Sequence, residues 1–394
     1  MTVYDCVVVG GGPAGATAAT DLAVAGRRVL LLDRAGRIKP CGGAIPPRLI
    51  ADFAIPDHLI VGRARRARMI GPSDIAVDMP VDPDGTGAAV GMVDRDIFDE
   101  WLRERAASSG AERRTGSFVR IDRDADDAPI VVFSADGAEA RVRARCVIGA
   151  DGARSRVARA TLADADRMPC VFAYHEVIRS PEPTDNGFDR ARCDVFYQAA
   201  LSPDFYAWVF PHGDTASVGV GSAQKGFALR DAVGRLRRRE GLGGCETIRR
   251  EGAPIPLKPL RKWDNGRDVL VTGDAAGVVA PASGEGIYYA MVAAREAANA
   301  VHAFLASGDP RALAQARRKF MRAHGKVFWI LGIMQHFWYR NDRRRERFVT
   351  MCEDRDVQHL IWPAYMTKHL TYARPLAYLR IFLKDMRHLL QTAG

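Results

Sequence analysis

The chain contains 394 residues, of which 47% are hydrophobic and 26% charged, and its formal net charge is +10. These values exclude a disordered or fibrous protein and provide enough chain for two domains and an extension. The seven cysteines are scattered and never in CxxC spacing, so we expect no disulfide framework, no metal site and a reducing compartment. No signal peptide is expected, because the first predicted strand begins within a few residues of Met1. The longest apolar run, residues 327–334, is far too short to span a bilayer.

The basic excess lies at the C-terminal end. Residues 311–394 contain 17 Lys+Arg and 6 Asp+Glu, whereas the rest of the chain contains 40 and 41. Aromatic side chains, including Trp329, Trp338 and Trp362, are interleaved with these charges, and this mixture favours contact with an anionic lipid interface. A solvated helical face is the alternative explanation, and nucleic acid is disfavoured because no recognition motif is present. We therefore expect a cytoplasmic protein that is peripheral on the cytoplasmic face of a membrane.

The N-terminal segments predict a strand, a helix and a second strand. Residues 3–9 form a short apolar run rich in β-branched side chains, and residues 13–25 are rich in alanine and stopped by Gly26. Residues 28–32 form a second apolar run, closed by Asp33. This order predicts two parallel strands joined by a right-handed helical crossover.

The turn between the first strand and the helix carries a dinucleotide-binding pattern. Gly10, Gly12 and Gly15 follow the strand in GxGxxG spacing, and Asp33 ends the next strand. The glycines permit a tight turn, close approach of the backbone to a pyrophosphate, and close helix–strand packing. The N-terminus of the helix favours phosphate, and Asp33 would accept hydrogen bonds from a ribose. The alternative for Asp33 is a solvated turn residue.

The remaining segments indicate a domain that is interrupted and then resumed. Residues 34–48 should be loop, residues 94–109 a helix, and residues 170–220 a separate antiparallel sheet. We expect the buried strand at 269–271 and the helix at 290–305 to belong again to the first domain. The tail from Arg311 should be helical. We therefore predict an α/β fold with a discontinuous dinucleotide-binding domain at 1–75, 95–165 and 265–310. A β-rich substrate domain at 76–94 and 166–264 and a basic helical region at 311–394 complete the prediction.

Several segments resemble a known group of flavoproteins. Residues 147–155 (VIGADGARS) and 272–276 (TGDAA) are similar to two FAD signatures of the flavoprotein hydroxylases and geranylgeranyl reductases. Residues 39–44 (KPCGGA) and 206–211 (YAWVFP) resemble segments that geranylgeranyl reductases place beside the flavin and along an isoprenoid cavity. Residues 254–259 and 280–287 continue the resemblance, which is closest to the reductases of chlorophyll and bacteriochlorophyll synthesis. Gly277 stands where the hydroxylases usually carry His, which disfavours an oxygenase.

The resemblance implies FAD as cofactor and a set of residues that contact it. That set is Gly10, Gly12, Gly15, Asp33, Cys41, Gly42, Ala44, Arg95, Val119, Asp274, Gly286 and Ile287. Arg95 could instead be a charged residue on the surface of a helix. Val119 could instead be a core residue of a strand. Tyr206, Trp208 and Phe210 alternate and so share one face of a strand. The resemblance implies that they line the substrate cavity, although aromatic residues at this spacing also form cores.

The resemblance also implies an activity. NADPH would reduce the flavin, which would then saturate three isolated double bonds of a geranylgeranyl chain to give phytyl. The chain would be carried by geranylgeranyl-(bacterio)chlorophyll, by geranylgeranyl diphosphate, or by both. Cys41 is the candidate catalytic residue, with either a chemical or a cavity-shaping role. The alternatives are a flavin-dependent monooxygenase, an archaeal-type prenyl-lipid reductase and a non-enzymatic flavin-binding scaffold.

Overall fold

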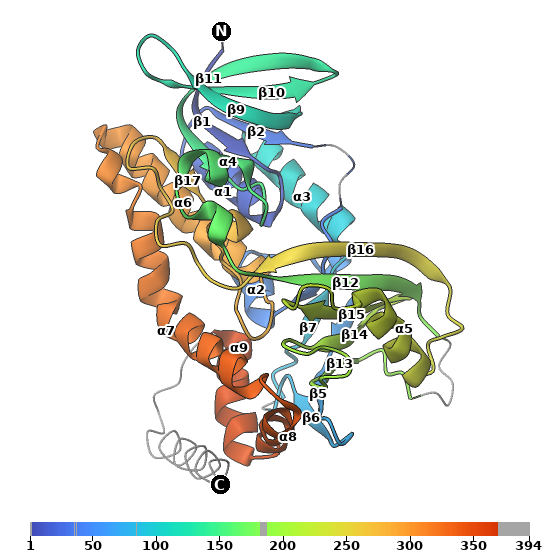
Figure 1. Cartoon of the computed structure of the whole chain (residues 1–394). Helices are drawn as coiled ribbons and strands as arrows, with labels where there is room; N and C mark the ends of the chain where they lie inside the picture. The colour runs from blue at the N-terminus through green and yellow to red at the C-terminus, as the bar shows by residue number, and fades with distance from the viewer. Residues whose placement is uncertain (1, 35, 37, 84, 182–186, 369–394) are drawn as a thin grey trace. The chain divides into compact units, whose positions relative to one another are not determined.

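A computed structural model describes all residues except 1, 35, 37, 84, 182–186 and 369–394 (Figure 1). The chain divides into two compact units. Unit 1 comprises Met1–Lys39, Arg95–Val171 and Pro254–Ile333, and unit 2 comprises Pro40–Asp94, Phe172–Ala253 and Met334–Gly394. Each unit thus collects segments that are far apart in the sequence.

Unit 1 is built on a seven-stranded sheet. Its path runs β8-β2-β1-β11-β10-β9, and β17 pairs with the C-terminal half of β11. The pairs β8–β2, β2–β1, β1–β11 and β11–β17 are parallel, whereas β10 and β9 continue as antiparallel strands. The bounds are β1 Val3–Val9, β2 Val29–Asp33, β8 Glu112–Thr115, β9 Ser117–Arg123, β10 Pro129–Ala135, β11 Ala138–Gly149 and β17 Val269–Val271. The parallel crossover that the sequence predicts is therefore confirmed.

Three helices pack together beside this sheet. Helix α1 (Pro13–Val24) contacts both α3 (Arg95–Ser108) and α6 (Ile287–Ser307). Alanines at 14, 16, 18 and 19 are buried in α1, and their small side chains permit close helix packing. A short helix α4 (Arg156–Thr161) follows β11.

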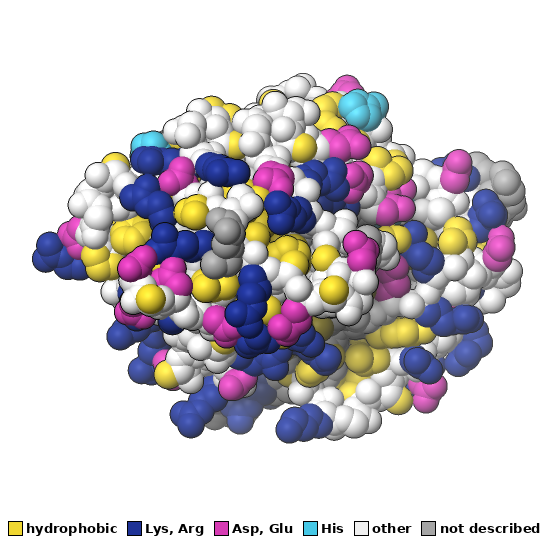
Figure 2. Space-filling model, turned by 90° about the horizontal axis from the view of Figure 1, so that it is seen from above, with side chains coloured by type: hydrophobic (Ala, Val, Ile, Leu, Met, Phe, Trp, Pro, Cys, Tyr) yellow, Lys and Arg dark blue, Asp and Glu magenta, His cyan; other side chains and the backbone are white. Residues whose placement is uncertain are grey.

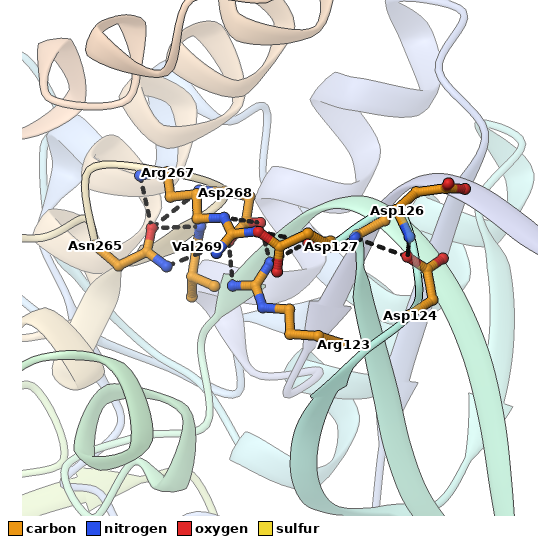
Figure 3. A network of polar contacts seen from close by, with 9 residues as sticks. Arg123, Asp124, Asp126, Asp127, Asn265, Arg267, Asp268 and Val269 are labelled. Carbon is orange, nitrogen blue, oxygen red and sulfur yellow. Dashed lines mark hydrogen bonds and ion pairs between the residues drawn. The ribbon is translucent and has the colours of Figure 1, made fainter.

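A polar network ties the start of β17 to the end of β9 (Figure 3). The guanidinium of Arg123 pairs with Asp268, donating from Nη2 to Oδ1 at 2.8 Å. The side-chain oxygen of Asn265 accepts from the backbone N–H groups of Arg267, Asp268 and Val269 at 2.9–3.0 Å. These bonds hold β17 in place and so position the turn at 273–276 that follows it.

Unit 2 contains a second seven-stranded sheet, of order β16-β12-β15-β14-β13-β5-β6. Strand β13 pairs with β5 in parallel, whereas the β12–β15, β15–β14, β14–β13 and β5–β6 pairs are antiparallel. Helix α5 (Leu229–Arg239) packs on β15 and buries Ala232, Val233 and Leu236 in the core (Figure 1). The bounds are β5 Arg66–Ile70, β6 Ala76–Pro80, β12 Cys170–Arg179, β13 Arg192–Phe196, β14 Ala207–His212, β15 Thr215–Ser222 and β16 Thr247–Pro256.

A small three-stranded sheet, β3-β7-β4, completes the strands of unit 2. Its strands are β3 Ala44–Ile45, β4 Gly62–Ala64 and β7 Val90–Met92, and helix α2 (Pro47–Asp52) follows β3. The expected loop at 34–48 therefore contains a strand and the start of a helix. The expected boundary at residue 75 also differs from the structure, because β5 joins the sheet of unit 2 through its pairing with β13.

The described part of the C-terminal region, residues 311–368, is largely helical, as the sequence predicts, but it is shared between the units rather than separate. Residues 369–394 of the predicted helical region lie outside the described residues. Helices α7 (Gln315–Trp338), α8 (Asp342–Met351) and α9 (Trp362–Thr367) are described, with a π-helical turn before α9. Phe320 and Phe328 of α7 contact Tyr289 of α6 within unit 1. In unit 2, the fully buried Arg345 donates to backbone carbonyls, among them that of Tyr339 at 2.6 Å. None of the helices in the described part of the chain is long and apolar enough to cross a membrane.

Charged side chains of both signs are interspersed on the face seen from above (Figure 2). Ion pairs along the β9–β11 hairpins contribute to this pattern within unit 1. Arg120 lies 2.7 Å from Glu139, and Arg143 lies 2.9 Å from Asp126. Exposed pairs of this kind contribute little to stability. In both pairs a basic side chain of unit 1 is matched by a nearby carboxylate.

Candidate cofactor and substrate site

The glycine loop after β1 leaves no room for side chains at two of its three motif positions. Gly10 has a φ of +104°, and a Cβ there would lie 2.7 Å from the carbonyl carbon of Ala150. A Cβ on Gly15 would overlap the carbonyl oxygen of Gly10. Gly12 differs, because nothing lies within 4 Å of its Cβ position. The loop is thus closed on the protein side and open at Gly12, where α1 begins without a side-chain cap.

Asp33 braces this loop. Its Oδ1 accepts a hydrogen bond from the backbone N–H of Gly11 at 2.9 Å. Arg103 of α3 lies 3.3 Å from Asp33 Oδ2 and also donates to the carbonyl of Gly11 at 3.2 Å. Asp33 is therefore more than a solvated turn residue. Arg103 was not anticipated, because its role depends on how α3 packs and no motif surrounds it.

The turn after β17 brings Asp274 to the start of α6. Asp274 is buried and pairs with the ammonium group of Lys39. A Cβ on Gly286, the N-cap of α6, would lie 3.7 Å from Asp274 Oδ1. A Cβ on Gly273 would lie 2.7 Å from the side chain of Ala14 in α1. The N-termini of α1 and α6 and the carboxylate of Asp274 thus gather in one region of unit 1.

The N-cap of α6, Gly286, makes no side-chain cap hydrogen bond, and the positive end of the helix dipole lies at this turn. The side chain of Ile287 is 6% exposed and belongs to the core. Any ligand contact of Ile287 would therefore be made by its backbone.

Arg95 and Val119 differ from the alternatives considered for them. Arg95 is 4% exposed and donates from Nε and Nη2 to the two carboxylate oxygens of Asp99 at 2.8 and 2.7 Å, so it is not a surface charge. Val119 is 37% exposed and so is not a core residue. The β9–β10 register shifts at this point: Phe118 pairs with Phe133 and Arg120 with Val132. Val119 is thus the extra residue of a bulge, which leaves its backbone outside the ladder.

The remaining signature positions have local structural explanations. Asp151 accepts from Ser155 Oγ at 2.5 Å and from the Arg156 N–H at 2.7 Å, and Ser155 caps α4. Burial raises the pKa of Asp151 despite these hydrogen bonds. Gly277 has a φ of +77°, and a Cβ there would overlap the carbonyl oxygen of Lys258. The backbone itself therefore excludes histidine at 277.

In unit 2, the loop that contains Cys41 is fastened to strand β14. His212 Nε2 lies 2.8 Å from the carbonyl oxygen of Gly42, to which it donates. A Cβ on Gly42 would lie 3.1 Å from the ring of Phe210. The half-exposed Cys41 accepts from the Gly43 N–H at 3.4 Å, and Ala44 opens strand β3. His212 directly follows the YAWVFP segment, but nothing in the sequence indicated that it would bind this loop.

Tyr206, Trp208 and Phe210 form a continuous row of rings, as alternation predicts. The ring centroids are 5.9 Å apart between Tyr206 and Trp208 and 6.1 Å apart between Trp208 and Phe210. Tyr206 also stacks on Phe205 at 4.2 Å. The structure therefore brings the Cys41 loop and the aromatic row together in one unit.

Comparisons with known proteins agree with this architecture. Residues 4–161 match the family model of the pyridine nucleotide-disulphide oxidoreductases, and residues 224–383 match that of the lycopene cyclase proteins. A solved geranylgeranyl bacteriochlorophyll reductase-like protein from Thermoplasma acidophilum is similar with a TM-score of 0.84. That comparison covers 100% of this chain and 98% of the other at 22% identity, and it shows the fold.

Two curated relatives match over nearly the whole chain. The geranylgeranyl diphosphate reductase of Rhodobacter capsulatus is 55% identical over 387 residues, covering 98% of this chain and 97% of the relative. The enzyme of the same name from Synechocystis is 37% identical, covering 99% and 98%. The fold is that of the FAD-dependent oxidoreductases, and the chain belongs to the geranylgeranyl diphosphate reductase family.

Proposed function

We propose that the protein binds FAD and saturates three isolated double bonds of a geranylgeranyl chain to give phytyl, with NADPH as electron donor. The substrate is geranylgeranyl diphosphate, the geranylgeranyl ester of (bacterio)chlorophyll, or both. The proposal rests chiefly on the glycine loop of unit 1, in which only Gly12 of the three motif glycines has free space at its Cβ position. This loop belongs to a chain that is 55% identical to a named reductase. The relatives' names support the substrate class.

The residues of unit 1 fit FAD. The open face at Gly12 and the uncapped start of α1 suit a pyrophosphate, and Asp33 suits the adenosine ribose. Asp274 would accept hydrogen bonds from the ribityl hydroxyls, and the first turn of α6 would favour negative charge on the ring. The unpaired backbone at Val119 suits the adenine edge. Arg95 remains a proposed contact near the ribityl–pyrophosphate stem, and Cys41, Gly42 and Ala44 remain proposed contacts of the ring.

The protein must assist this reaction with its own side chains. Bound FAD, once reduced, supplies one hydride for each double bond, and one proton must reach the other carbon of that bond. An isolated alkene has no carbonyl to accept negative charge, so protonation of the less substituted carbon must lead or accompany hydride transfer. Positive character then develops at the tertiary carbon. The ring faces of Tyr206, Trp208 and Phe210 can stabilise it while excluding water.

The proton carrier is proposed to be Tyr206 or a group near Cys41. Replacing Cys41 tests whether its thiol takes part in the reaction. A Cys41→Ala enzyme with an unchanged rate and product pattern would remove the thiol from the mechanism. A lower rate with unchanged FAD content is the expected result.

The function is tested by anaerobic incubation of the purified holoenzyme with NADPH and each geranylgeranyl substrate. Mass spectrometry should show products with two, four and then six added hydrogens. Bleaching of the flavin without a mass change would leave a flavoprotein with another substrate. An archaeal-type prenyl lipid would then be tested, and oxygen uptake coupled to hydroxylation would identify a monooxygenase. A flavin that no pyridine nucleotide bleaches would indicate a scaffold.

We also propose that helix α7 binds an anionic membrane surface. Trp329, Ile330 and Ile333 are 68%, 45% and 48% exposed, which is unusual for large apolar side chains. At 3.6 residues per turn they lie within about 120° of exposed basic residues of the same helix. Those residues are Arg318, Lys319, Arg322 and Lys326. A stripe that combines exposed basic and large apolar side chains can contact both anionic headgroups and the apolar boundary of a bilayer.

The membrane proposal is tested by flotation with vesicles that contain phosphatidylglycerol. The Trp329→Ser/Ile333→Ser variant should bind at least about tenfold more weakly, since each side chain contributes roughly 1.5–3 kcal/mol when buried. Ile97→Ser is the matched control, because Ile97 is 55% exposed on α3 of the same unit. Equal binding by the α7 variant and the control would contradict the proposal.

A further inference from the structure

A row of buried polar side chains shares a face of the unit 2 sheet with Trp208. The indole N–H of Trp208 donates to Ser217 Oγ at 3.1 Å, and His175 Nδ1 lies 3.0 Å from the same oxygen. His175 Nε2 lies 3.2 Å from Oε2 of Glu251 on β16, in a close but poorly aligned contact. Ser217 and His175 are only 2% and 3% exposed. The row thus runs from the aromatic strand through three further strands, β15, β12 and β16, and is largely shielded from water.

The chemistry of the groups sets the direction of each hydrogen bond. An indole N–H can only donate, so the Ser217 oxygen accepts from Trp208. When the imidazole carries a single proton, on the Nε2 that faces Glu251, the Ser217 hydroxyl donates to His175 Nδ1. Burial alone would raise the pKa of Glu251, but the close contact with His175 and the guanidinium of Arg249 at 3.0 Å outweigh it and lower that pKa. An ionised carboxylate therefore ends the row.

The packing around Trp208 adds a second restraint. Gly219 pairs with Trp208 on β14 and with His175 on β12. A Cβ on Gly219 would overlap the six-membered ring of the indole, so the ring lies directly over this glycine. The glycine restrains the tilt of the ring, and the bond to Ser217 restrains its rotation about Cβ–Cγ.

A structural role alone does not account for this row. Buried polar groups must be hydrogen-bonded to offset their loss of hydration, and apolar side chains of similar size often serve stability as well or better. What the polar row provides, and apolar packing would not, is one defined orientation of the indole. That orientation matters only if a ligand meets the ring.

We propose that Ser217 and His175 are positioning residues that hold the Trp208 indole in one orientation and thereby set how completely the prenyl chain is saturated. This inference rests on the proposed function, in which Trp208 lines the cavity of the prenyl chain. Saturation of three double bonds requires each of them to reach the flavin in turn, so the chain must slide along this cavity wall. An isoprenoid offers the wall only dispersion and ring-face contacts, so the orientation of the rings decides which double bond is held in place. A loosened indole holds the chain in several registers, and partly saturated products are released.

The test compares the products that wild-type and variant holoenzymes form from geranylgeranyl diphosphate. Mass spectrometry gives the fractions with one, two and three saturated bonds. Ser217→Ala should raise the partly saturated share by about fivefold, the factor that corresponds to one typical hydrogen bond. In a Trp208→Phe background, the same serine change should have no further effect, because no N–H is left for it to hold.

A second pair of variants tests the imidazole. His175→Asn retains an acceptor near the position of Nδ1 and should keep most of the wild-type pattern. His175→Gln moves its polar end toward the position of Nε2, leaves Ser217 without that acceptor, and should resemble Ser217→Ala. Thermal midpoint and FAD content show whether Ser217→Ala folds. If it does not fold, the two His175 variants provide the test.

The outcomes separate the inference from the function on which it rests. Equal effects of Ser217→Ala with and without the indole would overturn the inference, because the serine would then act independently of Trp208. A wild-type product pattern in Trp208→Phe would also overturn it, by removing Trp208 from the wall. If the wild-type holoenzyme saturates no bond of the substrate, it is the proposed function that fails.

Discussion

Replacing Gly12 with alanine should abolish tight FAD binding without unfolding the protein. The added methyl group would stand on the open face of the glycine loop, where nothing of the protein lies within 4 Å. A pyrophosphate held by the backbone of this loop must pass through that space. The methyl group would push it away from the N–H groups at the start of α1.

The magnitude follows from the bonds that would be lost. A hydrogen bond to a charged group contributes about 1.5–3 kcal/mol, so losing two costs at least about 3 kcal/mol, or roughly 100-fold in affinity. The free protein should tolerate the change, because Gly12 has a φ of −74° that any residue can adopt. Alanine is a poorer N-cap than glycine but also restricts the unfolded chain, and these opposing effects are each about 1 kcal/mol or less.

The assay titrates apoprotein with FAD by flavin fluorescence and measures unfolding of the apoprotein in urea. Gly244→Ala is the matched control, since its Cβ position is equally open, and its affinity should be unchanged. Gly15→Ala should instead unfold the apoprotein, because its Cβ overlaps the Gly10 carbonyl oxygen. An affinity of Gly12→Ala within twofold of wild type would refute the assignment of this loop to the pyrophosphate.

Two further predictions concern stability. Gly277→His should lower the free energy of unfolding in urea by at least about 2 kcal/mol, because a Cβ there overlaps the Lys258 carbonyl oxygen; an unchanged value would contradict the geometry. Arg237→Met should cost about 2 kcal/mol at pH 7.5, since the partly buried Glu176 carboxylate loses the guanidinium that lies 2.5 Å away and keeps only Arg250 at 3.3 Å and the Tyr174 hydroxyl at 3.1 Å. Burial alone would raise the pKa of Glu176, but the hydrogen bonds from Arg237 and Tyr174 outweigh it and hold that pKa below 4.5. The stabilisation is therefore present above pH 4.5 and lost as the pH falls through the lowered value, so the gap between variant and wild type should narrow in acid; a gap that widens would refute this reasoning.

The sequence predicts unit 1 well because its determinants are local. The β1–α1–β2 crossover depends on apolar runs and on glycines whose conformations are now visible, such as Gly10 at a φ of +104°. The alternation of Tyr206, Trp208 and Phe210 likewise required only the period of a strand. Arg103 was missed because its contact with Asp33 joins residues 70 positions apart through the packing of α3.

The domain boundaries could not be predicted for a related reason. The sequence of residues 66–70 does not indicate which unit they belong to. Their parallel pairing with β13, more than 120 residues later, assigns them to unit 2. The buried row of Ser217, His175 and Glu251 is similar. Its members lie on three strands, and a lone buried serine or histidine carries no sequence signal of its partners.

The structure also changes how the two substrate-related motifs relate to each other. The sequence suggests a flavin-side loop at 39–44 and a chain-side strand at 206–211 as separate features, but His212 and Phe210 hold Gly42 against that strand within unit 2. A chain lying along the aromatic row would therefore meet the Cys41 loop at a constant position. Under the proposed function, unit 1 would mainly bind the cofactor and unit 2 would set the choice of double bond. That division explains why the residues proposed to control the extent of saturation need not touch the cofactor at all.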